Sequence, residues 1–191
     1  YAYIPATIFQ KQIYFSDLTS VNGKFTIVWC WNLNTSISSE IIAPYLRKVI
    51  DKYEILRTTI VNDNNSILQK IAQSVSCNQV LLKDQFTSRP DSTFLKDLAE
   101  PSEGITFIID HDSSHLVNSI YGVASHSIID ATSIELLRSE LCSCLNDGVL
   151  APHIYEFQFA DLTDSLDSLE QRRPELSILD DTFGYDSPLQ S

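Results

Sequence analysis

The chain has 191 residues, of which 43% are hydrophobic and 20% are charged. This composition is typical of a globular protein with one sizeable core. The formal net charge is -12, from 25 acidic and 13 basic residues, and an acidic surface repels phosphate, which argues against nucleic acid and anionic membranes as partners. No apolar run is long enough to span a bilayer, and the first residues do not resemble a signal peptide. We expect a cytoplasmic protein, because the four cysteines suggest reduced thiols.

The first third of the chain alternates between helical and strand patterns. Pro5 suits the first turn of a short helix over residues 6–15, which carries apolar residues along one side. Residues 24–33 are β-branched and aromatic and predict a strand. Trp29 and Trp31 alternate with other apolar residues, so we expect this strand to be buried on both faces.

A long amphipathic helix and a hairpin come next. The helix is predicted over residues 38–53, with Ser38 or Ser39 as its N-cap. The segment Ile55–Thr58, "ILRT", reads as the start of a strand, and residues 57–72 alternate around "NDNN", which predicts a β-hairpin.

The second half contains strands followed by helices. Residues 77–85 predict a short strand, and "STFLKDLA" a brief helix. Two strands joined by a polar turn are predicted over residues 105–126, and a helix begins near Asp130. A last helix is expected up to Pro174, so we divide the chain into a lobe over residues 1–173 and a linker or tail over residues 174–191. Strands interleaved with helices indicate an α/β (α+β) sandwich with a mixed β-sheet flanked by helices.

No metal site is expected. The four cysteines are scattered, and two of them form a Cys-x-Cys pair whose thiols would point apart on a helix, so we expect reduced thiols. His111 and His115 flank the turn "DHDSS" with two aspartates, and we interpret this group as a solvated hairpin tip.

The segment "VASHSIIDATS", residues 123–133, places a histidine at the end of an apolar strand, four residues before an acid at a helix start. Together with three other landmarks, it resembles the condensation domains of nonribosomal peptide synthetases, which belong to the chloramphenicol-acetyltransferase-like superfamily. Ser125, His126, Asp130 and Ala131 match the family motif HHxxxDG, and "KYEILRT" matches the signature RHExLRT. "ATIFQKQIYF" and "FQFADLTDSL" match the segments at the start of the domain and after the motif helix.

The resemblance covers only the N-terminal lobe of a two-lobed family, so it implies a missing C-terminal lobe. Serine replaces the first motif histidine, and this SHxxxD variant resembles the terminal condensation-like domains of fungal synthetases, which release a peptide by cyclisation. The tyrosine that this subgroup tends to carry on the following helix is not found; Leu141 and Leu145 occupy that region.

The resemblance implies an acyltransferase that forms an amide, or an ester, from a peptidyl thioester. The thioester would sit on the phosphopantetheine arm of a peptidyl carrier domain, and no cofactor would be bound directly. His126 would act as a general base or position the nucleophile. Two alternatives are a non-catalytic half-domain that binds a carrier or forms a homodimer, and an acyltransferase that uses coenzyme A thioesters.

The other site residues have structural interpretations beside the functional ones. We expect Asp130 to form a buried ion pair with Arg57 that would cost about 3–5 kcal/mol to break, and it also suits a helix N-cap. Ser125 either donates a hydrogen bond to backbone or substrate or simply fits a crowded strand. Ala131 in place of glycine indicates that its backbone does not need a positive φ. Ser133 is expected to cap the helix rather than face a channel.

Overall fold

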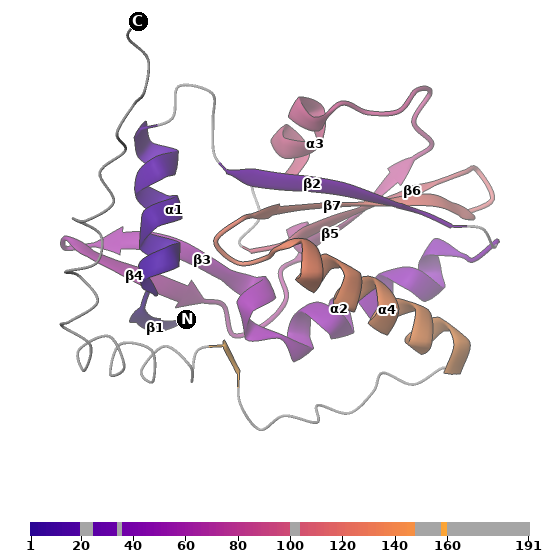
Figure 1. Ribbon diagram of the computed structural model, residues 1–191. Helices are drawn as coiled ribbons and strands as arrows, with labels where there is room; N and C mark the ends of the chain where they lie inside the picture. The colour runs from indigo at the N-terminus through magenta and orange to yellow at the C-terminus, as the bar shows by residue number, and fades with distance from the viewer. Residues whose placement is uncertain (20–24, 34–35, 100–103, 148–157, 160–191) are drawn as a thin grey trace, which may run out of the picture.

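The computed structural model describes residues 1–19, 25–33, 36–99, 104–147 and 158–159. Within these residues, the structure has two β-sheets and four α-helices (Figure 1). The strands are β1 (Ala2–Pro5), β2 (Thr26–Asn32), β3 (Thr58–Asp63), β4 (Ser66–Ile71), β5 (Val80–Asp84), β6 (Thr106–His111) and β7 (Val117–Ser125). The helices are α1 (Ile8–Thr19), α2 (Ser39–Lys52), α3 (Ser92–Ala99) and α4 (Ala131–Asp147), with short 3-10 helices η1 (Glu54–Arg57) and η2 (Cys77–Gln79). Among these residues, no helix is both long and apolar enough to cross a membrane.

The larger sheet has the strand order β2-β7-β6-β5 and is mixed, because β5 pairs with β6 in parallel while the other pairs are antiparallel. The helices α2 and α4 cover one of its faces and α3 covers the other (Figure 1). Trp29 and Trp31 pack into the core beneath α2 and α4, while Val28 and Cys30 pack on the α3 side. The expected mixed sheet and the two covered faces of β2 are therefore confirmed, although β2 is an edge strand and only half-buried.

The smaller sheet, β1-β4-β3, lies beside α1 (Figure 1). Its hairpin turns at Asn64 and Asn65, which both have positive φ, as a tight hairpin turn requires. The sequence did not predict β1, which ends at Pro5; the expectation that Pro5 begins a helix was wrong. The segment "ILRT" was also wrong as a strand start, because Glu54–Arg57 forms η1 and β3 begins at Thr58.

Other expectations agree with the structure. Ser38 caps α2, since its hydroxyl oxygen accepts a hydrogen bond from the Glu40 N–H at 3.2 Å. The brief helix predicted at "STFLKDLA" is α3.

The expectation of a solvated hairpin tip was wrong for two residues: Asp110 and His111 are buried at the end of β6. The predicted helix over residues 158–173, apart from its first two residues, and the tail over 174–191 lie outside the described residues.

A polar cluster joins the C-terminal end of α2 to α4. The Lys52 ammonium pairs with the Glu140 carboxylate, and the Tyr53 hydroxyl donates to the same carboxylate at 2.8 Å. Burial lowers the pKa of Lys52, but hydrogen bonds to Glu140 and Tyr53 outweigh burial and raise it above 10.5. Burial, followed by the hydrogen bond to Glu140, raises the pKa of Tyr53 above 10.0.

We predict that this cluster makes the fold sensitive to alkali. Lys52 and Tyr53 hold their protons more tightly in the folded chain, so their stabilising contribution is complete below about pH 10 and is lost as the pH rises through the raised pKa values. Urea unfolding at about pH 8 and about pH 11 measures this loss. At about pH 8, Glu140→Gln should be less stable than the native chain. Between about pH 8 and about pH 11 it should lose less stability, because it lacks the carboxylate that raises both pKa values. Equal losses in both proteins would contradict the prediction.

Candidate active site

His126 lies in the turn that directly follows β7. Its backbone N–H donates to the Phe25 carbonyl at 2.8 Å, which fixes the turn beside the start of β2. Its ring Nδ1 is 3.1 Å from the Ile129 carbonyl oxygen. A carbonyl can only accept, so this contact places a proton on Nδ1, and Nε2 is the nitrogen with the free lone pair whenever the ring is neutral.

The surroundings of His126 leave this ring half-buried. The ring of Phe9 on α1 meets the imidazole edge-on, with 5.9 Å between ring centroids. A half-buried imidazole in a single tautomer is suited to accept a proton from a nucleophile or to hold the nucleophile by a hydrogen bond.

Asp130 caps α4. Its carboxylate accepts a hydrogen bond from the Ser133 N–H at 2.7 Å, and its carbonyl accepts from Ile134. Hydrogen bonds from the Ser133 hydroxyl and backbone lower the pKa of Asp130, and the nearby His126 lowers it further. Asp130 is exposed, so the N-cap interpretation is confirmed and the buried ion pair is not.

The expected pair between Arg57 and Asp130 was wrong. Arg57 is buried in η1, where its guanidinium donates to the Ala72 carbonyl, lies 3.5 Å from the Asp51 carbonyl and is 3.7 Å from the Glu54 carboxylate. The first N–H groups of a helix have no partner within the helix, and Asp130 accepts from one of them, the Ser133 N–H. The Asp130 carboxylate therefore has a partner three residues away and does not need Arg57. Arg57 therefore joins the end of α2 to the segment after β4 and does not contact the His126 turn through Asp130.

The mutation of Asp130 distinguishes these two roles. As a cap, Asp130→Ala should lower the free energy of unfolding by only about 1 kcal/mol, and Asp130→Asn by less, because asparagine also caps helices. Combining Asp130→Ala with Arg57→Ala should show no coupling in urea unfolding. A coupling energy above about 1 kcal/mol between the two substitutions would contradict the cap interpretation and support the ion pair.

The remaining motif residues have local roles. The Ser125 hydroxyl is 2.8 Å from the Ser127 hydroxyl, and its oxygen accepts from the Ser127 N–H. Ser125 thus tightens the turn that contains His126. Ala131 begins α4 and is not among the described residues with positive φ, as expected. Ser133 does not cap the helix itself but donates to the cap.

The sequence interpretation missed a buried polar network behind His126. The Gln10 amide nitrogen donates to the Ser127 carbonyl and to Gln69, each at 3.3 Å. Thr7 and Gln10 form a reciprocal cap at the start of α1, and the spacing Thr-x-x-Gln at residues 7–10 was the signal that could have revealed it. Gln10 is 1% exposed, whereas the aromatic residues Phe9 and Phe15 of the same helix are about half-exposed.

No group of three or more His, Cys, Asp or Glu side chains able to hold a metal ion occurs among the residues that the structure describes. The four cysteines are free thiols.

Comparison with solved structures places this architecture among condensation domains. The starter condensation domain of rhizomide synthetase, in a mutant of RzmA, matches with a TM-score of 0.71 and 14% identity, over 98% of this chain and 50% of that chain. The condensation domain of the monacolin K polyketide synthase MokA matches with a TM-score of 0.70 and 16% identity, over 100% of this chain and 45% of that chain. The cyclization-docking bidomain of the EpoB nonribosomal peptide synthetase from Sorangium cellulosum matches with a TM-score of 0.65 and 15% identity, over 94% and 37%.

No family model matches the chain, and no curated protein matches its sequence. The chain spans about half the length of the solved condensation-domain structures, or less. The described residues therefore have the fold of one lobe of a condensation domain, of the chloramphenicol-acetyltransferase-like type.

Proposed function

We propose that the chain is the N-terminal lobe of a condensation-type acyltransferase that forms an amide from a carrier-bound peptidyl thioester, with cyclising release as its specific reaction. The observation that carries the proposal is the contact of His126 Nδ1 with the Ile129 carbonyl, at 3.1 Å, which leaves Nε2 as the proton-accepting nitrogen of the neutral ring, at the end of β7 in a fold shared with condensation domains. The substrate amine attacks the thioester carbonyl, the new C–N bond forms and the C–S bond breaks. The amine proton passes to Nε2 of His126 and then to the departing pantetheine sulfur.

A second lobe and a carrier domain are the partners that this proposal requires. Large apolar side chains on α1, on or next to β1, and just before β2 are between 47% and 65% exposed. They are Tyr1, Tyr3, Ile8, Phe9, Phe15, Leu18 and Phe25. Phe9 contacts the His126 ring, and the Phe25 carbonyl accepts from the His126 N–H. Exposed apolar side chains, two of them beside His126, support cover by a second lobe, which would exclude water from the thioester.

The second candidate function is a non-catalytic half-domain that docks a carrier or pairs with another copy. The same exposed apolar side chains favour it, because burying exposed apolar side chains drives association. The net charge of -12 disfavours the third interpretation, an acyltransferase for coenzyme A thioesters, because nucleotide phosphates need a basic surface.

Turnover of a carrier-bound peptidyl thioester, followed by mass spectrometry, tests the proposal. The chain is assayed alone and with a matching C-terminal lobe. We expect product only from the paired lobes and a loss of about 100-fold or more in His126→Ala. His115→Ala, in an exposed turn, is the matched control and should keep full activity. An unchanged rate in His126→Ala would remove this residue from the mechanism, and a stable dimer without turnover would favour the half-domain.

A further inference from the structure

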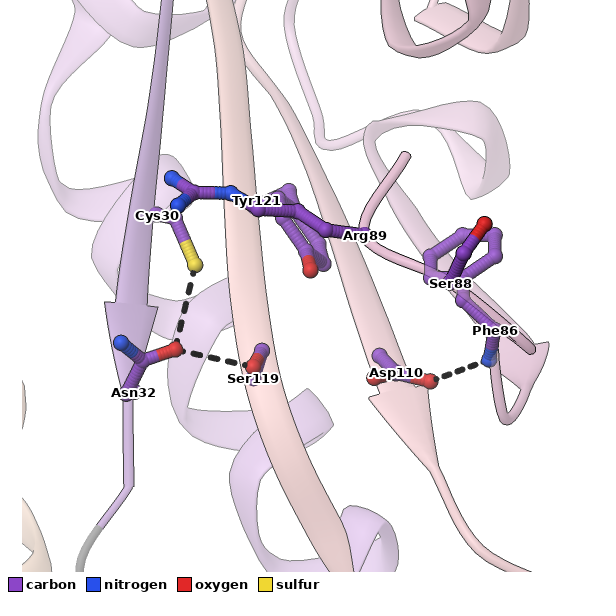
Figure 2. Close-up of a pocket in the computed structure, with 8 residues that line it drawn as sticks. All are labelled: Cys30, Asn32, Phe86, Ser88, Arg89, Asp110, Ser119 and Tyr121. Atoms are coloured by element: carbon purple, nitrogen blue, oxygen red, sulfur yellow. Dashed lines mark hydrogen bonds between the residues drawn. The ribbon is translucent and has the colours of Figure 1, made fainter. Parts of the chain in front are cut away.

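A second polar site lies on the sheet face that α3 covers, away from His126 (Figure 2). Toward the Asn32 end of β2, the paired side chains on this face of the sheet are polar. Cys30 and Tyr121 pair across β2 and β7, and the next pair on the same face is Asn32 with Ser119. Asp110 of β6 pairs with Ser119 from the other side. Ser119 and the Ser125 end of β7 are about 20 Å apart along the strand, so this pocket is separate from the candidate active site.

The floor of the pocket is fixed by its own hydrogen bonds. The Asn32 side-chain oxygen accepts from the Ser119 hydroxyl at 3.1 Å and from the Cys30 thiol at 3.4 Å (Figure 2). The Asn32 amide nitrogen remains a donor. The cavity has a volume of about 280 Å³, at the small end of the range for ligand sites, which suits a small polar molecule.

Asp110 supplies a buried negative charge on one side. It is 6% exposed, and one carboxylate oxygen accepts from the Phe86 N–H at 3.0 Å. Lys83 on β5 pairs with Asp110 in the parallel ladder. Among the described residues, however, neither Lys83 nor any other cation forms an ion pair with Asp110. A buried carboxylate without a cation is unfavourable, so a cationic ligand group beside it would be stabilised.

Arg89 supplies a positive charge on the other side. It stands on the segment between β5 and α3, and its side chain extends across the pocket toward Cys30 and Tyr121, away from Asp110 (Figure 2). Within the described part of the chain, the guanidinium forms no ion pair. Guanidinium donors match the geometry of a carboxylate.

We propose that this pocket binds a free α-amino acid as a zwitterion. The ligand ammonium group lies against Asp110 and the ligand carboxylate binds Arg89, while Asn32 and the hydroxyl groups of Ser119 and Tyr121 line the space for the side chain. Opposite charges on opposite sides of a small cavity select a molecule that carries both charges over one that carries either alone. This site does not depend on the reaction proposed for His126.

Titration of the whole chain with L-serine, followed by ligand-observed NMR, tests the proposal. Ethanolamine is serine without the carboxylate, and 3-hydroxypropanoate is serine without the amine. We expect saturable binding of serine and at least tenfold weaker binding of both fragments. Arg89→Gln should weaken serine binding at least tenfold and leave ethanolamine unchanged, and Asp110→Asn should weaken serine and ethanolamine alike.

Arg138→Gln is the control variant, because Arg138 is exposed and paired with Glu135 on α4. Its serine affinity should equal that of the native chain. Circular dichroism checks that each variant is folded. If Asp110→Asn unfolds, the serine affinity of Arg89→Gln alone tests the proposal. Absence of serine binding, equal affinity for serine and its fragments, or unchanged affinity in Arg89→Gln would each overturn the proposal.

Discussion

Gly104→Ala is expected to lower the free energy of unfolding by about 3–5 kcal/mol, the largest effect of any single substitution we propose. Gly104 has φ +89°, which an L-residue adopts only with strain. An added Cβ would meet the Leu56 carbonyl and lie 2.8 Å from Arg57 Cα. These are backbone atoms held by the hydrogen bond from the Ile105 N–H to the Leu56 carbonyl, at 2.8 Å, so they have no rotamer to change.

Gly122→Ala is the matched control in urea unfolding. A Cβ on Gly122 would meet the indole ring of Trp29, which is a side chain. The loss of stability in Gly122→Ala should therefore be relieved by Trp29→Leu, whereas no truncation of a side chain should rescue Gly104→Ala. An unfolding curve of Gly104→Ala that coincides with that of the native chain would contradict the packing of β6 against η1.

The elements that the sequence predicted well are those with a local cause. The hairpin of β3 and β4 follows from strand alternation on either side of two asparagines that tolerate positive φ. The helix α2 follows from the spacing of its apolar residues and from Ser38 at its N-cap. Each of these signals lies within the segment that it shapes.

The missed features depend on distant partners. The strand β1 is short and mostly exposed, and it exists because Ala2–Pro5 pairs with β4, more than 60 residues away. The partners of Arg57 include the carbonyls of Asp51 and Ala72, and every residue carries a carbonyl, so the sequence does not single them out. Conversely, Asp130 looked like a partner for Arg57 because opposite charges are visible in a sequence. His126 was identified correctly as a strand-end histidine, but its tautomer depends on the Ile129 carbonyl.

Gln10→Met is expected to lower the free energy of unfolding by about 3 kcal/mol and to disturb the turn that carries His126. Methionine fills a similar volume but neither donates nor accepts as an amide does. The substitution leaves the buried Ser127 carbonyl and the Thr7 N–H without the bonds that Gln10 provides. Each buried group that loses its partner costs about 1–3 kcal/mol. Gln12→Met, on the exposed side of the same helix, is the control and should change stability by less than about 0.5 kcal/mol.

The effect on the site is read from the ring nitrogens of His126 by ¹⁵N NMR. In the native chain we expect the neutral imidazole to give the signature of a protonated Nδ1 and an unprotonated Nε2, because Nδ1 donates to the Ile129 carbonyl. In Gln10→Met the Ser127 carbonyl is no longer held against α1, so the turn from Ser125 to Ile129 gains freedom and the two tautomers should mix. A loss of stability with an unchanged His126 tautomer would mean that Gln10 only caps α1. A changed tautomer would mean that α1, through one buried amide, holds the imidazole in the state in which it can accept a proton.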